Sequence, residues 1–183
     1  MKNLFLTLVL LSSYFTLAQN DIVAPEPDFE GEISFVKDGK ELVELEMVTT
    51  SMKSGQSVGR MLSGIGKVKA RVVAKGKTST TVIQKDEIIY FIYNHGSNNL
   101  RPDKVAQLLK FEQRKKTREY LIASSSNVSG QTETNVVEGI KFKGSKYGET
   151  SYLIKVSNLE PGEYAFFVGT EETYDGNFFT VVE

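Results

Sequence analysis

The sequence contains no cysteine, no tryptophan and only one histidine. Without cysteine, a disulfide framework, a thiolate metal site and a lipid attached through a cysteine are all excluded. His95 is the single imidazole, and the residues around it supply no partner for acid–base catalysis. These absences favour a protein that is not an enzyme, and no motif in the chain indicates a cofactor or a metal requirement.

The chain also lacks an excess of charge of either sign. It has 22 basic and 23 acidic residues, which gives a formal net charge of −1. Such a balance provides no overall attraction to nucleic acid or to an anionic membrane. We therefore expect no nucleic-acid partner.

Long apolar runs are absent except at the N-terminus. Lys2 precedes an apolar stretch from Leu4 to Leu11, and small residues at Thr16 and Ala18 suit a cleavage site. The stretch is shorter than the roughly 20 residues that cross a bilayer. The sequence therefore predicts a signal peptide over residues 1–18, export to the periplasm, outer surface or medium, and no transmembrane segment after cleavage. The absence of disulfides in an exported chain favours a bacterial source.

Residues 19–30 contain two prolines and several acids with little apolar periodicity, which predicts a flexible spacer. Residues 31–183 are predicted to form a single β domain. Its first two strands, 33–37 and 41–47, flank Asp38 and Gly39, and an Asp-Gly pair between alternating strands is a strong hairpin signal.

The run from Glu87 to Tyr93 is apolar on both faces, so we expect a central strand covered on both sides by a flanking segment or a partner. Lys67–Lys77 alternates basic and apolar residues, which indicates a strand with a basic outer stripe. Residues 49–66 are interpreted as a loop or an irregular edge, and 124–137 as a polar loop. Residues 102–109 fit a short helix, whereas a hairpin from Gln107 onward is favoured.

Four further short strands are expected near the C-terminus, over 140–142, 152–156, 164–168 and 178–182. Short strands separated by turns, without helices between them, predict an all-β protein. The specific prediction is an antiparallel Ig-like β-sandwich of about eight to ten strands with at most one short helix.

The segment Leu159–Phe166 reads LEPGEYAF. It resembles the pattern that leads into the penultimate strand of many Ig-like and fibronectin-like domains. The resemblance implies that Pro161 and Gly162 shape the turn and that the Tyr164 hydroxyl bonds back to the preceding loop as a tyrosine corner.

The chain is also similar to small secreted proteins of Bacteroidetes-type bacteria. The residues that carry this likeness are Gln107–Phe111, Arg118–Tyr120, Tyr147–Gly148 and Leu159–Phe166. It implies a β-sandwich in the cell envelope and transfers no activity.

Two charged regions are candidate sites. Glu171, Glu172, Asp175 and Asn177 offer oxygen ligands for Ca²⁺, but an Asp-Gly turn explains the same residues without a metal. The basic residues of Lys67–Lys77, repeated around Lys110–Arg118, suit an anionic glycan, although a solvated outer face accounts for them equally well.

The favoured function is a non-enzymatic envelope protein that binds another envelope component through its loops and one apolar face, including Met61, Leu62 and Ile65. The alternative is a carbohydrate-binding or accessory module of a polysaccharide-processing system. In that alternative, Tyr90, Tyr93 and Tyr147 form a stacking platform.

Overall fold

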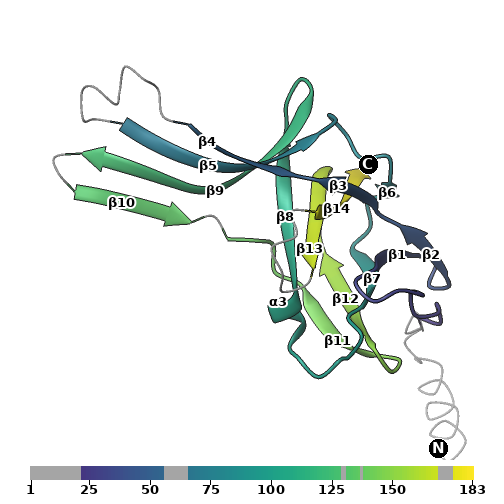
Figure 1. Ribbon diagram of the computed structural model, residues 1–183. Coiled ribbons are helices and arrows are strands. Elements are labelled where there is room, and N and C mark those ends of the chain that lie inside the picture. Colours follow the sequence, from purple (N-terminus) through teal and green to yellow (C-terminus); the bar gives the residue numbers. More distant parts are fainter. Residues whose placement is uncertain (1–21, 56–65, 129–130, 137, 169–174) are drawn as a thin grey trace, which may run out of the picture.

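The computed structural model describes residues 22–55, 66–128, 131–136, 138–168 and 175–183. In these residues the protein is all-β, with fourteen strands in two sheets and one helix of four residues. Every strand pair is antiparallel apart from β6 with β14. The predicted all-β class, the antiparallel sheets and the single short helix are therefore confirmed (Figure 1).

The elements follow one another along the chain as β1 (Ile33–Lys37), β2 (Glu41–Glu44), β3 (Glu46–Thr49), β4 (Ser51–Gly55), β5 (Gly66–Lys75), β6 (Val82–Gln84), β7 (Ile88–Asn94), α3 (Pro102–Val105), β8 (Ala106–Gln113), β9 (Thr117–Val128), β10 (Gln131–Val136), β11 (Lys143–Tyr147), β12 (Ser151–Ser157), β13 (Gly162–Val168) and β14 (Asp175–Val182).

The smaller sheet has five strands in the order β11-β12-β7-β1-β2. β7 is its central strand, as the two apolar faces of the sequence predicted. Ile89, Phe91 and Tyr93 point to one side of β7 and belong to the main core. Ile92 points to the other side, where Tyr90 also packs.

The larger sheet has nine strands, seven of them in the order β3-β14-β13-β8-β9-β5-β4. β3 and β4 stand at opposite ends of this order, yet only Thr50 separates them along the chain. The sheet must therefore curl until its two ends meet, which gives it a near-closed, barrel-like shape. We refer to it as the curled sheet.

The main core lies between the five-stranded sheet and one wall of the curled sheet. Phe91 packs against Phe166 and Phe179, with ring centroids 4.9 Å and 5.0 Å apart. A second core fills the inside of the curled sheet, where Phe111, Tyr120 and Phe178 gather. The strands between the two cores contribute to both, because successive side chains of a strand point to opposite faces of the sheet.

The predicted Asp-Gly hairpin is present between β1 and β2. Asp38 and Gly39 have positive φ angles of 51° and 72°, the conformation that such a turn requires. The strand predicted over 41–47 is instead divided at Leu45. β2 pairs in the five-stranded sheet and β3 pairs in the curled sheet, so Leu45 is buried at the crossing while Met47 is 70% exposed.

The polar stretch 124–137 was wrongly predicted to be a loop. Most of it forms the end of β9 and all of β10, which pair with each other from Ala123 to Val136. In residues 102–113, both predicted structures occur in succession. α3 ends at Val105 and the β8–β9 hairpin follows at once. These additional strands and the division at Leu45 explain why the count exceeds the predicted one.

Residues 22–30, predicted to be a flexible spacer, lie against the five-stranded sheet. Ala24 is buried with Val36 and Ile92, and Val23 N donates to Gly39 O. The Asn94 amide donates to Pro27 O at 2.8 Å. This segment covers the outer face of β7, so the flanking cover that the sequence required is part of the same chain.

Candidate functional site

The C-terminal turn contains the hydrogen bond that the LEPGEY pattern implies. The Tyr164 hydroxyl donates to Glu160 O at 2.5 Å, and the tyrosine ring is buried against Phe179. Pro161 and Gly162 join this carbonyl to the start of β13. The arrangement fixes the turn and presents no reactive group.

The candidate calcium ligands are only partly placed. Asp175 and Asn177 lie in β14, opposite Thr49 and Met47 of β3. Glu171 and Glu172 fall outside the described residues. Within the described part of the chain, no three metal-ligating His, Asp or Glu side chains come together.

The basic stripe is interrupted. Arg71 of β5 lies 3.6 Å from a Glu119 oxygen and 3.8 Å from a Glu112 oxygen, so two carboxylates balance its charge. Lys69 and Lys75 are exposed, and Lys77 follows the end of β5. The Lys67 side chain is outside the described residues. The described residues therefore offer isolated lysines rather than a continuous cationic row.

Arg118, grouped by sequence with the basic hairpin tip, is instead completely buried inside the curled sheet. Its guanidinium lies 3.0 Å from a Glu46 oxygen and 3.6 Å from a Glu163 oxygen. It also donates to Lys75 O and covers the ring of Phe178 at 4.3 Å.

Glu163 is equally buried, and several donors surround its carboxylate. Ser79 N, the Gln113 amide and the Thr180 hydroxyl donate to it at 2.9, 3.1 and 2.8 Å. Through Ser79, this cluster holds the segment after β5 onto one end of the curled sheet. The sequence signal for it was the spacing of Arg118, Tyr120 and Ile122, which share one face of β9. The charged groups of the cluster bond to one another and to neighbouring backbone and side-chain groups, so we interpret it as structural.

His95 and the three tyrosines of the proposed platform are not arranged for catalysis or stacking. His95 Nδ1 is 3.0 Å from the Tyr93 hydroxyl, and no carboxylate is paired with it in the described residues. Tyr93 is buried in the main core, whereas Tyr90 and Tyr147 pack on the opposite face of the sheet. Burial and opposite orientation prevent these rings from forming one surface.

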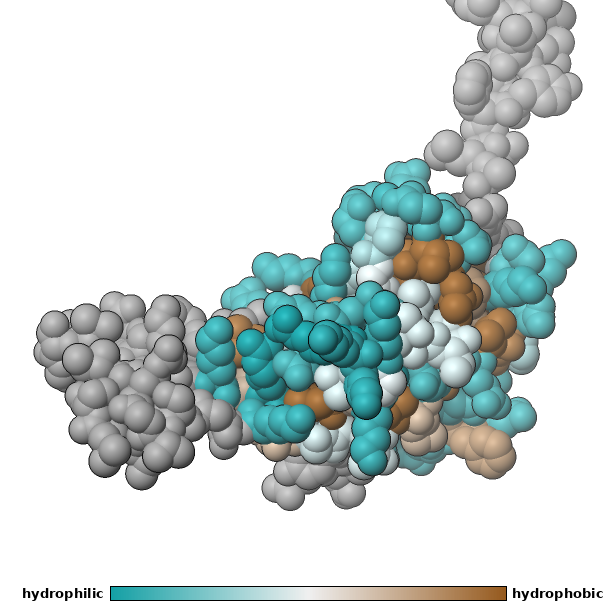
Figure 2. All heavy atoms as spheres, turned by 90° about the horizontal axis from the view of Figure 1, so that it is seen from above, coloured by the Kyte–Doolittle hydropathy of each residue, from teal (hydrophilic) through white to brown (hydrophobic). Residues whose placement is uncertain are grey.

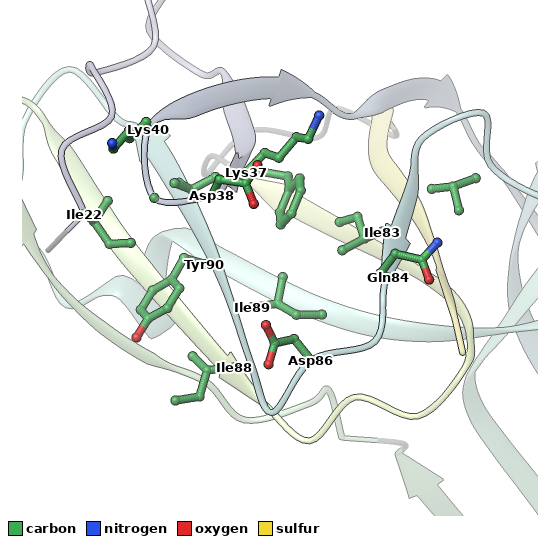
Figure 3. A pocket seen from close by; sticks show the side chains of 14 residues that line it. Ile22, Lys37, Asp38, Lys40, Ile83, Gln84, Asp86, Ile88, Ile89 and Tyr90 are labelled. Atoms are coloured by element: carbon green, nitrogen blue, oxygen red, sulfur yellow. The ribbon is translucent and has the colours of Figure 1, made fainter. Parts of the chain in front are cut away.

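A cavity of about 750 Å³ opens where β1 and β7 diverge (Figure 3). Its lining is mixed, and the apolar part includes Ile22, Ile83, Ile88 and Ile89. Lys37, Lys40, Asp38 and Asp86 stand at its margin. Asp38 and Asp86 bring two carboxylates to this cavity, from the β1–β2 turn and from the segment before β7.

The most distinctive feature of the molecule is a projection that we call the arm. It consists of β4, β10 and the parts of β5 and β9 that pair with them, and it extends away from the rest of the protein (Figure 1). Among the described residues β10 pairs with β9 alone, so its other side is an edge of the described sheet. At the base of the arm Met52 is 56% exposed.

Apolar side chains also reach the surface of the body, among hydrophilic ones (Figure 2). The most exposed large ones are Val23, Phe29, Met47, Val82 and Leu100. None of the described helices is long and apolar enough to cross a membrane. No protein-family model, curated protein or solved structure matches the chain.

Proposed function

We propose that this is an exported, non-enzymatic binding protein of a bacterial cell envelope, and that its arm contacts another envelope protein. The observation that carries the proposal is the arm itself. Its four strands lie beside one another, and no described strand other than β9 pairs with β10. A free strand edge offers backbone donors and acceptors to a partner.

Composition supports the same role. The residues that form the outer part of β9 and β10 include Ser124, Ser125, Ser126, Thr132 and Thr134. A small sheet rich in such residues buries little apolar area to offset the entropy of ordering its backbone. Contact with a partner would provide the missing stabilisation.

The proposal also includes an Ig-like origin of the fold and export by a signal peptide. The pattern around Tyr164 supports an Ig-like sandwich as the ancestry of the two facing sheets, and residues 1–18 support export by a signal peptide.

The intact mass of protein recovered from the periplasm or medium should correspond to a chain that begins at Gln19. A mass that retains Met1 would contradict export with cleavage.

The arm can be tested by photo-crosslinking in cells. A photoreactive amino acid is placed at Met52 or at Lys69, both exposed, and at Leu100 on the body as a control. We expect the two arm positions to yield the same crosslinked protein and Leu100 to yield none. Equal crosslinking from Leu100, or none from the arm, would refute the arm as the contact.

A further inference from the structure

Two lysines and a tyrosine form a row across the outer face of the five-stranded sheet. Lys143 of β11 lies directly opposite Lys155 of β12, and Lys155 lies opposite Tyr90 of β7. Directly opposite residues share a face of the sheet, with Cβ atoms about 4.5–5.5 Å apart. Tyr90 packs on the outer face, so all three side chains lie there. Lys155 Nζ is 5.9 Å from the centroid of the Tyr90 ring.

The two lysines are a like-charge pair without a counter-charge in the described part of the chain. Like charges that lie directly opposite each other destabilise a sheet. Neither ammonium group is in an ion pair with a described residue. The neighbouring positions of β11 and β12 on the same face are Ser145, Leu153 and Ser157, and none of them carries a carboxylate.

Elsewhere the chain neutralises such a pair with its own side chains. Glu112 of β8 lies directly opposite Glu119 of β9, so two carboxylates face each other there. Two arginines, Arg71 and Arg114, are each in ion pairs with both of these carboxylates. The lysine pair has no corresponding acid among the described residues, so its charge is available to an anion from outside the chain.

We propose that this row binds an acidic saccharide, whose carboxylate lies between the ammonium groups of Lys143 and Lys155 and whose sugar ring lies against Tyr90. The flexible stems of the two lysines allow both ammonium groups to approach one carboxylate. The face of an aromatic ring is negatively polarised and attracts the C–H groups of a sugar ring. Because Lys155 is close to the Tyr90 ring, a single sugar residue contacts both.

The surroundings of Tyr90 favour a saccharide over a lipid. Tyr90 lines the cavity described above, beside Ile22 and Ile88 (Figure 3). The same cavity contains the amide of Gln84 and the carboxylate of Asp86, which hydrogen-bond readily to hydroxyl groups. An acyl chain would remove these polar groups from water without offering them a hydrogen bond.

The row remains accessible beside the N-terminal segment. Ala24 of this segment packs against Ile92, which is two residues after Tyr90 in β7. Lys143 is exposed, and Lys155 and Tyr90 are half-buried. Neighbouring strands are about 4.8 Å apart, so the three strands span about 10 Å, which suits one or two sugar residues. The site lies on the body of the protein and does not involve the arm.

The test measures binding of acidic disaccharides to the chain that begins at Gln19. The probes contain glucuronate, galacturonate or mannuronate, and NMR follows the side-chain signals of Lys143 and Lys155. The methyl ester of each disaccharide is the matched control, because it keeps the rings and removes the charge. Succinate supplies the charge without a ring. We expect at least one disaccharide to bind and to shift both lysine signals, and its ester and succinate to bind about tenfold more weakly or less.

A charge reversal separates binding from stability. Lys143→Glu places a carboxylate opposite Lys155, so it replaces repulsion with attraction within the sheet and repels the saccharide. We expect the melting temperature to stay the same or rise while binding weakens about tenfold or more. The control is Lys146→Glu, an exposed position of β11 opposite Tyr152, whose ring belongs to the main core. Lys146 therefore points to the other face, and its reversal should leave binding unchanged.

Several results would overturn the proposal. These are the absence of binding by all of the disaccharides, equal binding of the esters or of succinate, and equal losses in Lys143→Glu and Lys146→Glu. Tighter binding to phosphatidylglycerol vesicles, lost in Lys143→Glu, would assign the row to a lipid headgroup instead. None of these results depends on crosslinking from the arm.

Discussion

Tyr164 shows how a single hydroxyl stabilises a turn in this protein. Tyr164→Phe removes the hydrogen bond to Glu160 O and leaves that carbonyl without its partner. We expect a loss of about 0.5–1.5 kcal/mol in the free energy of unfolding. The measurement is the denaturant midpoint.

The control for Tyr164 must be a tyrosine whose hydroxyl is free. Tyr147 is unsuitable because its hydroxyl donates to Ala24 O. Tyr90→Phe removes the same atom from a half-buried ring with no hydroxyl partner in the described residues, and it should leave the midpoint nearly unchanged. Equal effects of the two substitutions would show that the Tyr164 bond contributes nothing.

Glu26 fastens the N-terminal segment to the turn before β12. Glu149 N, Thr150 N and the Thr150 hydroxyl donate to its carboxylate at 2.8, 3.1 and 2.9 Å. The nearby Ser151 hydroxyl, followed by these donors, lowers the pKa of Glu26 from 4.5 to about 2. Ser151 Oγ makes no hydrogen bond in this structure, so the bonds from Glu149 and Thr150 are the ones that hold the carboxylate.

This depressed pKa predicts a specific pH dependence. The ionised carboxylate stabilises the fold fully above pH 4.5, and the stabilisation is lost as the pH falls from 4.5 toward 2. Glu26→Gln should therefore lower stability by about 1–2 kcal/mol at neutral pH, and the difference from the native protein should vanish near pH 2. Asp28→Asn, at an exposed neighbour, is the control. A difference that persists unchanged at low pH would contradict this role of Glu26.

At the scale of strands, the buried Arg118–Glu163 pair joins β9 to β13 inside the curled sheet. Arg118→Met leaves the Glu163 charge buried without its cation, and breaking such a pair costs about 3–5 kcal/mol. We expect the double variant Arg118→Met/Glu163→Gln to lose less stability than the single one. Urea midpoints of both variants give the comparison. Strictly additive losses would show that the two charges are not coupled.

A matched control for that pair is Arg71→Met on the adjacent strand β5. Arg71 is 21% exposed, and its carboxylate partners lie 3.6 Å and 3.8 Å away. A solvent-accessible pair contributes about 0–1 kcal/mol. We therefore expect Arg71→Met to lose less stability than Arg118→Met, because the burial of the ion pair, rather than the number of its partners, determines the loss of free energy of unfolding.

Alternation of residues predicted the strands that bury one face or both. β1, β7 and β13 follow the sequence pattern because their apolar side chains line a core. The division at Leu45 was not visible, because alternation continues from β2 into β3 while the strand changes sheets. β10 was missed because Ser, Thr and Asn provide no apolar face. Arg118 was predicted to lie on the surface because it is charged. It is two residues before Tyr120 in β9, however, so both side chains point to the same, buried face.

For the molecule as a whole, the packing of residues 22–27 shows that the domain begins before β1. The cavity lined by β1, β6 and β7 was equally beyond sequence reasoning, since segments distant in the sequence form it. Both features come from long-range pairing, which a local pattern does not encode.

The N-terminal segment gives the last prediction, which compares two adjacent residues. Ala24 is 4% exposed and packs against Val36 and Ile92, whereas Val23 is 62% exposed. Ala24→Asp places a carboxylate against an apolar surface, where an uncompensated polar group costs roughly 1–3 kcal/mol, and it should lift the segment from the sheet. We therefore expect Ala24→Asp to lower the melting temperature and to bind an apolar dye at the outer face of β7. Val23→Asp adds the same charge to solvent and should do neither. If the two variants behave alike, or if a chain that begins at Asp28 is as stable as one that begins at Gln19, the segment is not part of the folded domain.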